Sequence, residues 1–321
     1  MHNRRRLHNR IAESELTLPA CAVLSAVLWC WPSRPWLVDS WVEGAKWLGS
    51  LLVMLLVAYV VLETNNVNQL IRIRTRMMSS LWCLLAGALP LLHQSDAPLF
   101  VALCAAVSYN LLLRCYQLAN ASGPFFYAIV ALSLASLTSP LLLLLALPCF
   151  YYLTVFLRAM SLRTLCAGLL GMALPYFFWA VWCFLHDDMT PLQNHLQELL
   201  LRPTMTLQQL PLVSQITAGV LAFFAVVGLL HYWRRNYNDK IRTRQLLYVY
   251  VVQSLVLFAL LAWHPECFTA LVPVIAVTII SLLAHYFALI RTWFSSVIFV
   301  LSTLIYAGLA YINLWNPSLH F

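Results

Sequence analysis

Long apolar runs, separated by short polar segments, extend along most of this chain. The runs divide into eleven segments, most of them close to the roughly 17–25 residues that a helix needs to cross a bilayer. We place them near 17–32, 46–63, 77–92, 97–113, 124–138, 140–157, 165–185, 211–232, 246–263, 268–290 and 293–315. The expected fold class is all-α: a polytopic α-helical membrane protein with about 11 transmembrane helices, forming a single membrane domain over residues 1–321.

The region 124–157 is the least regular part of this pattern. It is an almost continuous apolar stretch, interrupted by Ser139-Pro140, that is long for one crossing and short for two. A single crossing would move Arg158, Arg163 and the basic loop 234–244 to the other side of the membrane. Two crossings keep all of these residues on one side, so we predict a helical hairpin.

The composition agrees with a membrane protein. Hydrophobic residues make up 62% of the chain and charged residues only 9%, whereas about 25% of the residues in an average soluble domain are charged. Because so few charges cannot cover the surface of a soluble fold, the bilayer must be the main solvent. The first apolar run follows a basic stretch, as in a signal peptide. No small-residue cleavage site closes it, so we interpret it as a retained first span.

Positive charge is distributed unevenly between the predicted loops. When the loops are assigned alternately to two sides, all Lys and Arg residues fall on one side except Arg34, Lys46 and Arg202. Loops rich in Lys and Arg stay in the cytoplasm. The sequence therefore predicts a multi-pass protein of the bacterial inner (cytoplasmic) membrane, with a cytoplasmic N-terminus and a periplasmic C-terminus. The net charge of +8 fits contact with anionic membrane lipids, and no nucleic-acid partner is expected.

Residues 186–210 form the longest predicted periplasmic loop. Thr190 followed by Pro191 and Gln193 is typical of a helix start, with Thr190 as the N-cap. The predicted helix has two faces, one with Leu192, Leu196, Leu199 and Leu200 and the opposite one with His195, Glu198 and Arg202. We therefore expect an amphipathic helix in the outer membrane interface.

The predicted spans contain few polar groups. No Asp, Glu, Lys or Arg lies near the middle of any span. Ion-coupled transporters and proton pumps usually need such a group at depth, so this absence argues against them. The deepest strongly polar side chains are Gln253 and Asn110, which we expect to make interhelical hydrogen bonds. His285, near an inner span end, is expected to be a packing histidine. Neither a cofactor nor a metal site is predicted, because no Cys or His spacing matches a ligand motif.

Most groups able to do chemistry fall on the predicted outer face. The candidate catalytic residues are Asp39, Glu43, His186, Asp187 and His195. Carboxylates and histidines that face each other across a cavity can transfer protons. Trp36 and Trp41 are candidate substrate-binding residues, because a flat indole ring can stack against a sugar. Two alternatives stay open: tryptophans at this depth can form an interfacial belt, and charge bias alone permits acidic residues outside.

Two predicted cytoplasmic loops contain similar segments. Asn66-Val67-Asn68 precedes Ile73-Arg74-Thr75-Arg76, and Asn236-Tyr237-Asn238 precedes Ile241-Arg242-Thr243-Arg244. They lie six spans apart and so have the same orientation, as in a parallel repeat. Arg-rich loops can also converge on similar tetrapeptides, and we favour this second interpretation.

A set of motifs in the first half carries a family resemblance. The motifs are Asn65-Asn66-x-Asn68, Tyr109-Asn110, Arg114, Leu134-Ala135-Ser136-Leu137-Thr138-Ser139-Pro140, Arg163 and Leu174-Pro175-Tyr176. Over residues 60–185 the chain resembles an uncharacterised family of polytopic inner-membrane proteins from Gram-negative bacteria. The resemblance implies location and architecture but no catalytic residue. The polar residues of these motifs lie at the predicted cytoplasmic ends of spans. They therefore favour a site at the cytoplasmic face as an alternative to the outer-face site.

The acidic residues of the first outer loop also give the chain a fold-level similarity to polyprenyl-linked glycosyltransferases. Our leading functional hypothesis is a role in envelope biogenesis, with a lipid or lipid-linked glycan handled at the outer face. The alternatives are an uncoupled permease or exporter, and a structural subunit that needs other envelope proteins. Whether the chain is an enzyme stays open.

Overall fold

The computed structural model describes residues 11–33, 41–73, 75–94, 96–199, 203–235, 237, 239–289 and 292–315. These residues form helices and turns and no β-strand. The helices are α2 (Thr17–Ser33), α3 (Trp41–Asn68), α4 (Met77–Ala88), α5 (Pro90–Gln94), α6 (Asp96–Leu113), α7 (Ser122–Ser136), η2 (Pro140–Leu145), α8 (Ala146–Val155), α9 (Leu162–Leu185), α10 (Thr190–Glu198), η3 (Leu207–Gln209), α11 (Leu212–Arg235), α12 (Ile241–Trp263), η5 (Pro265–Cys267), α13 (Phe268–Leu289) and α14 (Trp293–Trp315).

Each predicted apolar segment contains a helix of the structure. Six helical stretches are long and apolar enough to cross a membrane: Gly44–Asn68, Leu162–Leu185, Leu212–Arg235, Ile241–Trp263, Pro265–Leu289 and Trp293–Asn313. The other apolar helices, such as α4 and α7, are shorter. The length and composition of these helices are those of a multi-pass membrane protein.

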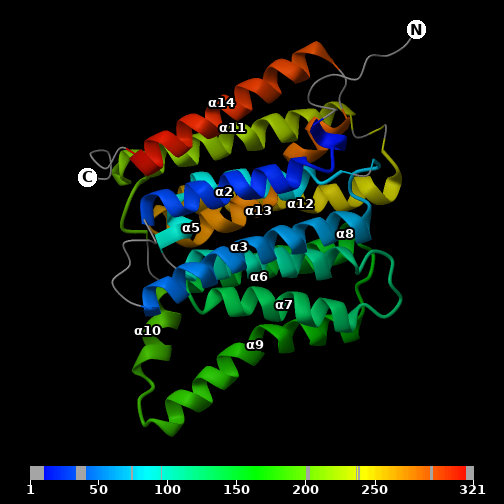
Figure 1. Cartoon of the computed structure of the whole chain (residues 1–321). Coiled ribbons are helices and arrows are strands. Elements are labelled where there is room, and N and C mark those ends of the chain that lie inside the picture. Colours follow the sequence, from blue (N-terminus) through cyan, green and yellow to red (C-terminus); the bar gives the residue numbers. More distant parts are fainter. Residues whose placement is uncertain are drawn as a thin grey trace.

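Helix α13 lies at the centre of the molecule, with α4, α6, α11 and α12 packed around it (Figure 1). Of its most apolar stretch, 89% is buried, against 22% for the peripheral helix α9. A helix that is hydrophobic on all sides is stable only when other helices cover it. The surrounding helices therefore bury one face each against α13 or its neighbours.

The outer faces of the peripheral helices are apolar as well. On α9, Leu170, Phe177 and Phe178 are exposed, and Leu304 and Val300 are exposed on α14. In water these surfaces would be a large unfavourable apolar area, whereas lipid chains solvate them. The exposed apolar side chains agree with the bilayer as solvent.

The loops gather at two ends of the bundle. We call one the basic end: it holds the ends of α3, α6, α8, α11 and α13 and the starts of α2, α4, α7, α9, α12 and α14. There the Thr243 hydroxyl donates to the Gln69 carbonyl (3.5 Å). At the opposite end, the Asn313 amide donates to the Ala88 carbonyl (2.9 Å). The basic end carries Arg72, Arg76, Arg114, Arg158, Arg163, Arg234, Arg235, Lys240, Arg242 and Arg244, and Lys46 lies towards the opposite end.

The predicted hairpin over 124–157 is present as α7 followed by the η2–α8 run. The Gln117 amide, before α7, donates to the Leu157 carbonyl, after α8 (2.8 Å). The entry and exit of the pair therefore lie together at the basic end, and the chain reverses direction near Ser139-Pro140.

Gln253 and Asn110 make the interhelical hydrogen bonds predicted for them. The Tyr152 hydroxyl on α8 donates to Gln253 Oε1 on α12 (2.8 Å), and Asn110 Nδ2 on α6 donates to Thr64 Oγ1 on α3 (2.9 Å). Each bond satisfies a polar group that lipid could not satisfy.

The surface helix of the 186–210 segment exists, but two details of its prediction are wrong. Its first residue is Thr190 and its N-cap is Met189. The Asp188 carboxylate, one residue earlier, accepts from the Thr190 backbone amide (3.0 Å) and hydroxyl. These hydrogen bonds lower the pKa of the Asp188 carboxyl below its usual value. His195 lies on the half-buried face with Leu192 and Leu199, because it bonds to α7, while Leu196 is exposed.

Glycine allows close approach of α11 to α13. A Cβ atom added at Gly228 would lie 2.9 Å from Leu282 Cβ, while a Cβ at Gly219 on the same helix would meet nothing within 4 Å. The α11 backbone at Gly228 therefore packs directly against the central helix α13.

We predict that Gly228→Ala destabilises the protein by about 1–3 kcal/mol, because the added methyl overpacks the α11–α13 contact. The measurement is the thermal midpoint of the purified protein in detergent. Gly219→Ala is the matched control and should leave the midpoint unchanged or raise it slightly, since Ala favours the helix. Equal effects of the two substitutions would contradict this account of the packing.

Candidate functional site

The predicted outer-face residues have different surroundings. Trp36 and Asp39 lie outside the described residues, and Glu43 lies in α3 with its side chain outside them. Trp41 begins α3 and is 97% exposed. Neither tryptophan can therefore be assigned to the wall of a cavity.

The two candidate histidines near α10 face different ways. His186 is exposed beside Trp182, with Nδ1 2.8 Å from the Trp182 carbonyl, and Asp187 is exposed next to it. His195 turns inward: Nε2 lies 3.0 Å from the Ser136 carbonyl, and the ring packs edge-on against Trp179. His195 thus attaches α10 to the body of the protein.

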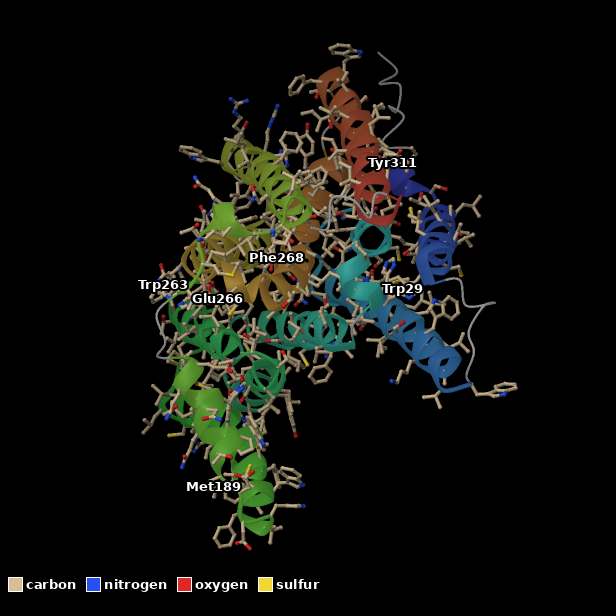
Figure 2. The ribbon with its side chains drawn as sticks, turned by 90° about the vertical axis from the view of Figure 1, so that its left-hand side faces the viewer. Trp29, Met189, Trp263, Glu266, Phe268 and Tyr311 are labelled. Carbon is tan, nitrogen blue, oxygen red and sulfur yellow. The ribbon has the colours of Figure 1, made fainter. Side chains whose placement is uncertain are left out.

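The described residues of the two parts of the predicted outer site lie apart. Figure 2 shows the start of α3 and the tip of the α9–α10 arm, marked by Met189, at separate corners of the molecule. Within the described part of the chain, no three His, Cys, Asp or Glu side chains are arranged to hold a metal ion. The shared outer site stays a prediction.

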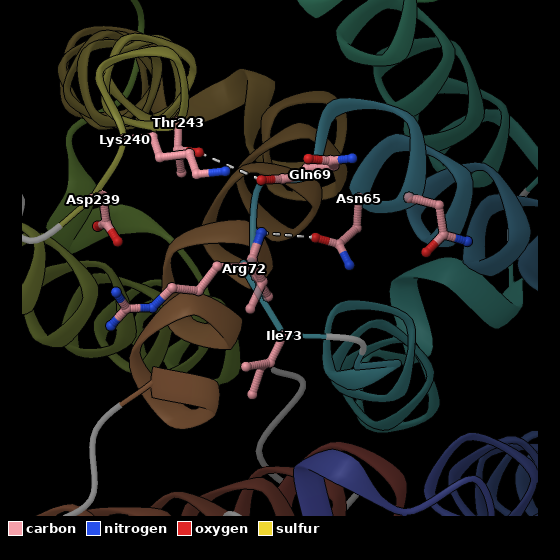
Figure 3. A pocket seen from close by; sticks show the side chains of 9 residues that line it. Asn65, Gln69, Arg72, Ile73, Asp239, Lys240 and Thr243 are labelled. Atoms are coloured by element: carbon pink, nitrogen blue, oxygen red, sulfur yellow. Dashed lines mark hydrogen bonds between the residues drawn. The ribbon is translucent and has the colours of Figure 1, made fainter.

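A cavity of about 660 Å³ lies instead at the basic end (Figure 3). Its walls come from the end of α3 with the turn that follows, and from the start of α12. The lining residues are Asn65, Asn66, Gln69, Ile71, Arg72, Ile73, Asp239, Lys240 and Thr243. We refer to it as the basic-end cavity.

The first wall is shaped by a turn around Asn65. This residue is buried, its Oδ1 accepts from the Ile71 amide (3.1 Å), and its Nδ2 donates to the Thr75 carbonyl (3.4 Å). Gln69 adopts a positive φ of 51°, which ends α3 and turns the chain back. One buried amide thus holds both ends of the segment that lines the cavity.

This turn is also connected to the N-terminal segment. The Thr75 hydroxyl donates to the Ala12 carbonyl, and Arg76 Nη1 donates to the Glu15 carbonyl (3.2 Å). The residues before α2 therefore rest on the same turn that forms the cavity wall.

The second wall is the first turn of α12. The Thr243 hydroxyl reaches the Gln69 carbonyl across the cavity, and the Arg242 guanidinium lies 5.9 Å from the centre of the Tyr116 ring. The tetrapeptide 241–244 is helical here, whereas Ile73, Thr75 and Arg76 of the matching segment are non-helical and precede α4. Ile73 and Thr243, one from each segment, line the same cavity, but the described residues of the two segments differ in conformation.

The cavity is positively charged on two sides. Figure 3 shows the Lys240 side chain reaching towards Gln69 and the Arg72 guanidinium on the side of Asp239. Amide groups of Asn66 and Gln69 add hydrogen-bonding capacity at the mouth, where both residues are exposed. Two cations with neighbouring amides are the equipment for binding an anion such as a phosphate.

Asp239 connects the cavity to two buried histidines. Its Oδ2 lies 3.2 Å from His285 Nε2 on α13, and the His285 ring centre lies 5.4 Å from that of His231 on α11. His285 was predicted to be a packing histidine, and no role was predicted for Asp239. The available signal was that Asp239 is the only acidic residue in the basic stretch 234–244.

No protein-family model, curated protein or solved structure matches this chain. The resemblance of residues 60–185 to the uncharacterised inner-membrane family therefore stays a prediction. The function has to be argued from the site itself.

We predict that Asn65→Ala lowers stability by about 1–3 kcal/mol, because the buried Ile71 amide and Thr75 carbonyl lose their partner. The measurement is again the thermal midpoint in detergent. Asn66→Ala is the control, since Asn66 is exposed beside it. A midpoint that falls equally in both variants would show that Asn65 does not hold the turn.

Proposed function

We propose that this chain is an eleven-span protein of the bacterial inner membrane, with the basic end and the N-terminus in the cytoplasm and the C-terminus in the periplasm. We further propose that it acts in envelope biogenesis by binding the phosphate group of a lipid or lipid-linked precursor. The basic-end cavity is the observation that carries this proposal.

The charge of the cavity supports an anionic ligand. Arg72 and Lys240 line it, and most of the described Lys and Arg residues lie at the same end of the bundle. Cations near the membrane surface attract anionic lipid heads by about 1 kcal/mol each. The amides of Asn66 and Gln69 can donate to phosphate oxygens that the cations do not reach.

The position of the cavity supports a ligand at the membrane boundary. Its walls lie where the apolar helix α3 ends and where the apolar helix α12 begins. A phosphate group at that level can belong to a lipid whose chains stay in the bilayer, or to a soluble molecule from the aqueous side. Both carry the same recognised group, and experiment separates them.

The interior of the bundle favours binding over conduction. A permease needs a polar path through the membrane, yet α13 occupies the centre and its buried side chains are mainly Ile, Leu, Val, Ala and Phe. The side-chain hydrogen bond between Tyr109 and Thr278 ties α6 to α13 in that interior (2.9 Å). We therefore place the ligand in the basic-end cavity instead of in a central pathway.

The topology gives one prediction. A reporter that is active only in the periplasm should work when fused after Pro203 or Phe321 and stay silent when fused after Asn238, because basic loops resist translocation. Alkaline phosphatase fusions in living cells provide the measurement. Activity after Asn238 would reverse the assignment of the basic end.

The binding site gives a second prediction. Lys240→Gln should weaken binding of phosphatidylglycerol to the detergent-solubilised protein about fivefold, the equivalent of about 1 kcal/mol for one cation. Native mass spectrometry with added lipid measures the change. Lys46→Gln, at the opposite end of the bundle, should bind as the unchanged protein does.

Competition identifies the source of the phosphate. If the soluble head group glycerophosphoglycerol displaces the lipid at similar concentration, the ligand is a free phosphodiester; if it does not, the acyl chains contribute and the ligand is a lipid. Equal weakening by Lys240→Gln and Lys46→Gln would contradict the basic-end cavity as the site.

A further inference from the structure

Three ionisable side chains meet behind the wall of the basic-end cavity. They are Asp239 before α12, His285 on α13 and His231 on α11. The side chains of His285 and Asp239 are only 3% and 4% exposed, and His231 is buried as well. Asp239 also lines the cavity, so the cluster joins the aqueous mouth to the central helix.

Five buried polar atoms of this cluster have no hydrogen-bond partner in the protein. Both ring nitrogens of His231 and of His285 and Oδ2 of Asp239 are buried without a partner. His285 Nε2 and Asp239 Oδ2 are 3.2 Å apart but do not meet the angular requirements of a hydrogen bond. Leaving one buried polar atom unsatisfied costs about 1–3 kcal/mol. Such a concentration of buried polar atoms without protein partners favours the binding of a small species at this place.

A proton is the species that suits this geometry. Protonated His285 becomes an imidazolium with two donors, and the donor at Nε2 faces a carboxylate oxygen at contact distance. A small rotation of either side chain completes a charge-assisted hydrogen bond. The His231 ring lies beside that of His285, tilted by 42° with the ring centres 5.4 Å apart.

We propose that Asp239 and His285, with His231 beside them, form a proton-binding site that controls the affinity of the basic-end cavity for its anionic ligand. The effect on ligand affinity rests on the proposed function, whereas the proton-binding site itself does not. Intramembrane ionisable groups that pair with one another commonly mark such sites.

The other charged and ionisable side chains near the cluster lie on the surrounding helices and at the cavity. Arg235 and Tyr232 are the other ionisable side chains of α11 near the cluster. On α13, the Tyr286 ring packs edge-on against His231. Lys240 and Arg72 line the cavity in front of the cluster. Helices α4 and α14 contain no charged residue, and α6 has only Asp96, at the opposite end.

The sign of the effect follows from the charge balance. Without the proton, the Asp239 carboxylate gives the cavity wall one negative charge, which opposes an anion. With the proton, His285 and Asp239 form a neutral pair, and the field of Arg72 and Lys240 is no longer reduced. Anion binding is therefore tighter at lower pH, and by linkage the bound anion promotes proton uptake.

The proton site can be tested without any ligand. In protein labelled with ¹³C at histidine Cε1, the His285 resonance, assigned from its loss in His285→Gln, should titrate between pH 5 and 8. Asp239→Asn should abolish this titration while the protein remains monodisperse in detergent. A His285 resonance that stays constant over this range, or one that titrates identically in Asp239→Asn, would overturn the proposal.

The link to the cavity is tested with a probe of constant charge. Binding of phosphatidylglycerol, a phosphodiester that keeps its charge between pH 5 and 8, should be about fivefold or more tighter at pH 6 than at pH 8. His285→Gln should remove this pH dependence. His264→Gln is the matched control, because His264 also contacts a carboxylate, Glu266, but at the opposite end (2.8 Å).

The outcomes separate the two proposals. Binding that is tight but independent of pH contradicts the coupling and leaves the proposed function standing. No binding of phosphatidylglycerol or glycerophosphoglycerol at any pH contradicts the proposed function, while the histidine titration still decides whether the proton site exists.

Discussion

The burial of α13 on all sides is the constraint on which the rest of this structure depends. Its most apolar stretch is 89% buried, and α4, α6, α11 and α12 are the helices that cover it. In a bilayer the hydrophobic effect does not hold helices together, because lipid chains are as apolar as leucine. The close approach at Gly228 and the hydrogen bond of Tyr109 to Thr278 therefore take over that role. Both act directly on α13.

The same constraint positions the basic-end cavity. Since α13 fills the centre, polar segments can gather only at the ends of the bundle, where water and lipid head groups satisfy them. The turn after α3 and the start of α12 meet at one of these ends, held by Asn65 and Thr243. Asp239 is drawn inward from that meeting point to His285, and so a carboxylate is buried beneath a cationic surface.

The helices could be predicted from the sequence because long apolar runs and the bias of basic loops are strong, local signals. The hairpin near Pro140 followed from the same bias. The direction of His195 could not be predicted, since an amphipathic pattern does not say which face binds protein when Ser136 on another helix supplies the partner. The contact of Asp239 with His285 was equally inaccessible. It joins His285 on α13 to Asp239 in the turn before α12. The position of Asp239 within a basic stretch marks that residue in the sequence, but it does not identify His285 as the partner.

The hydrogen bonds of Thr75 and Arg76 to residues 12 and 15 make the N-terminal segment part of the cavity wall. The buried Asn65 side chain donates a hydrogen bond to the Thr75 carbonyl in the same turn. A displacement of this turn when the cavity fills would therefore also move the start of α2, a helix that packs against α4. Helix α2 would in that way respond to a ligand bound by residues as distant in the sequence as Lys240.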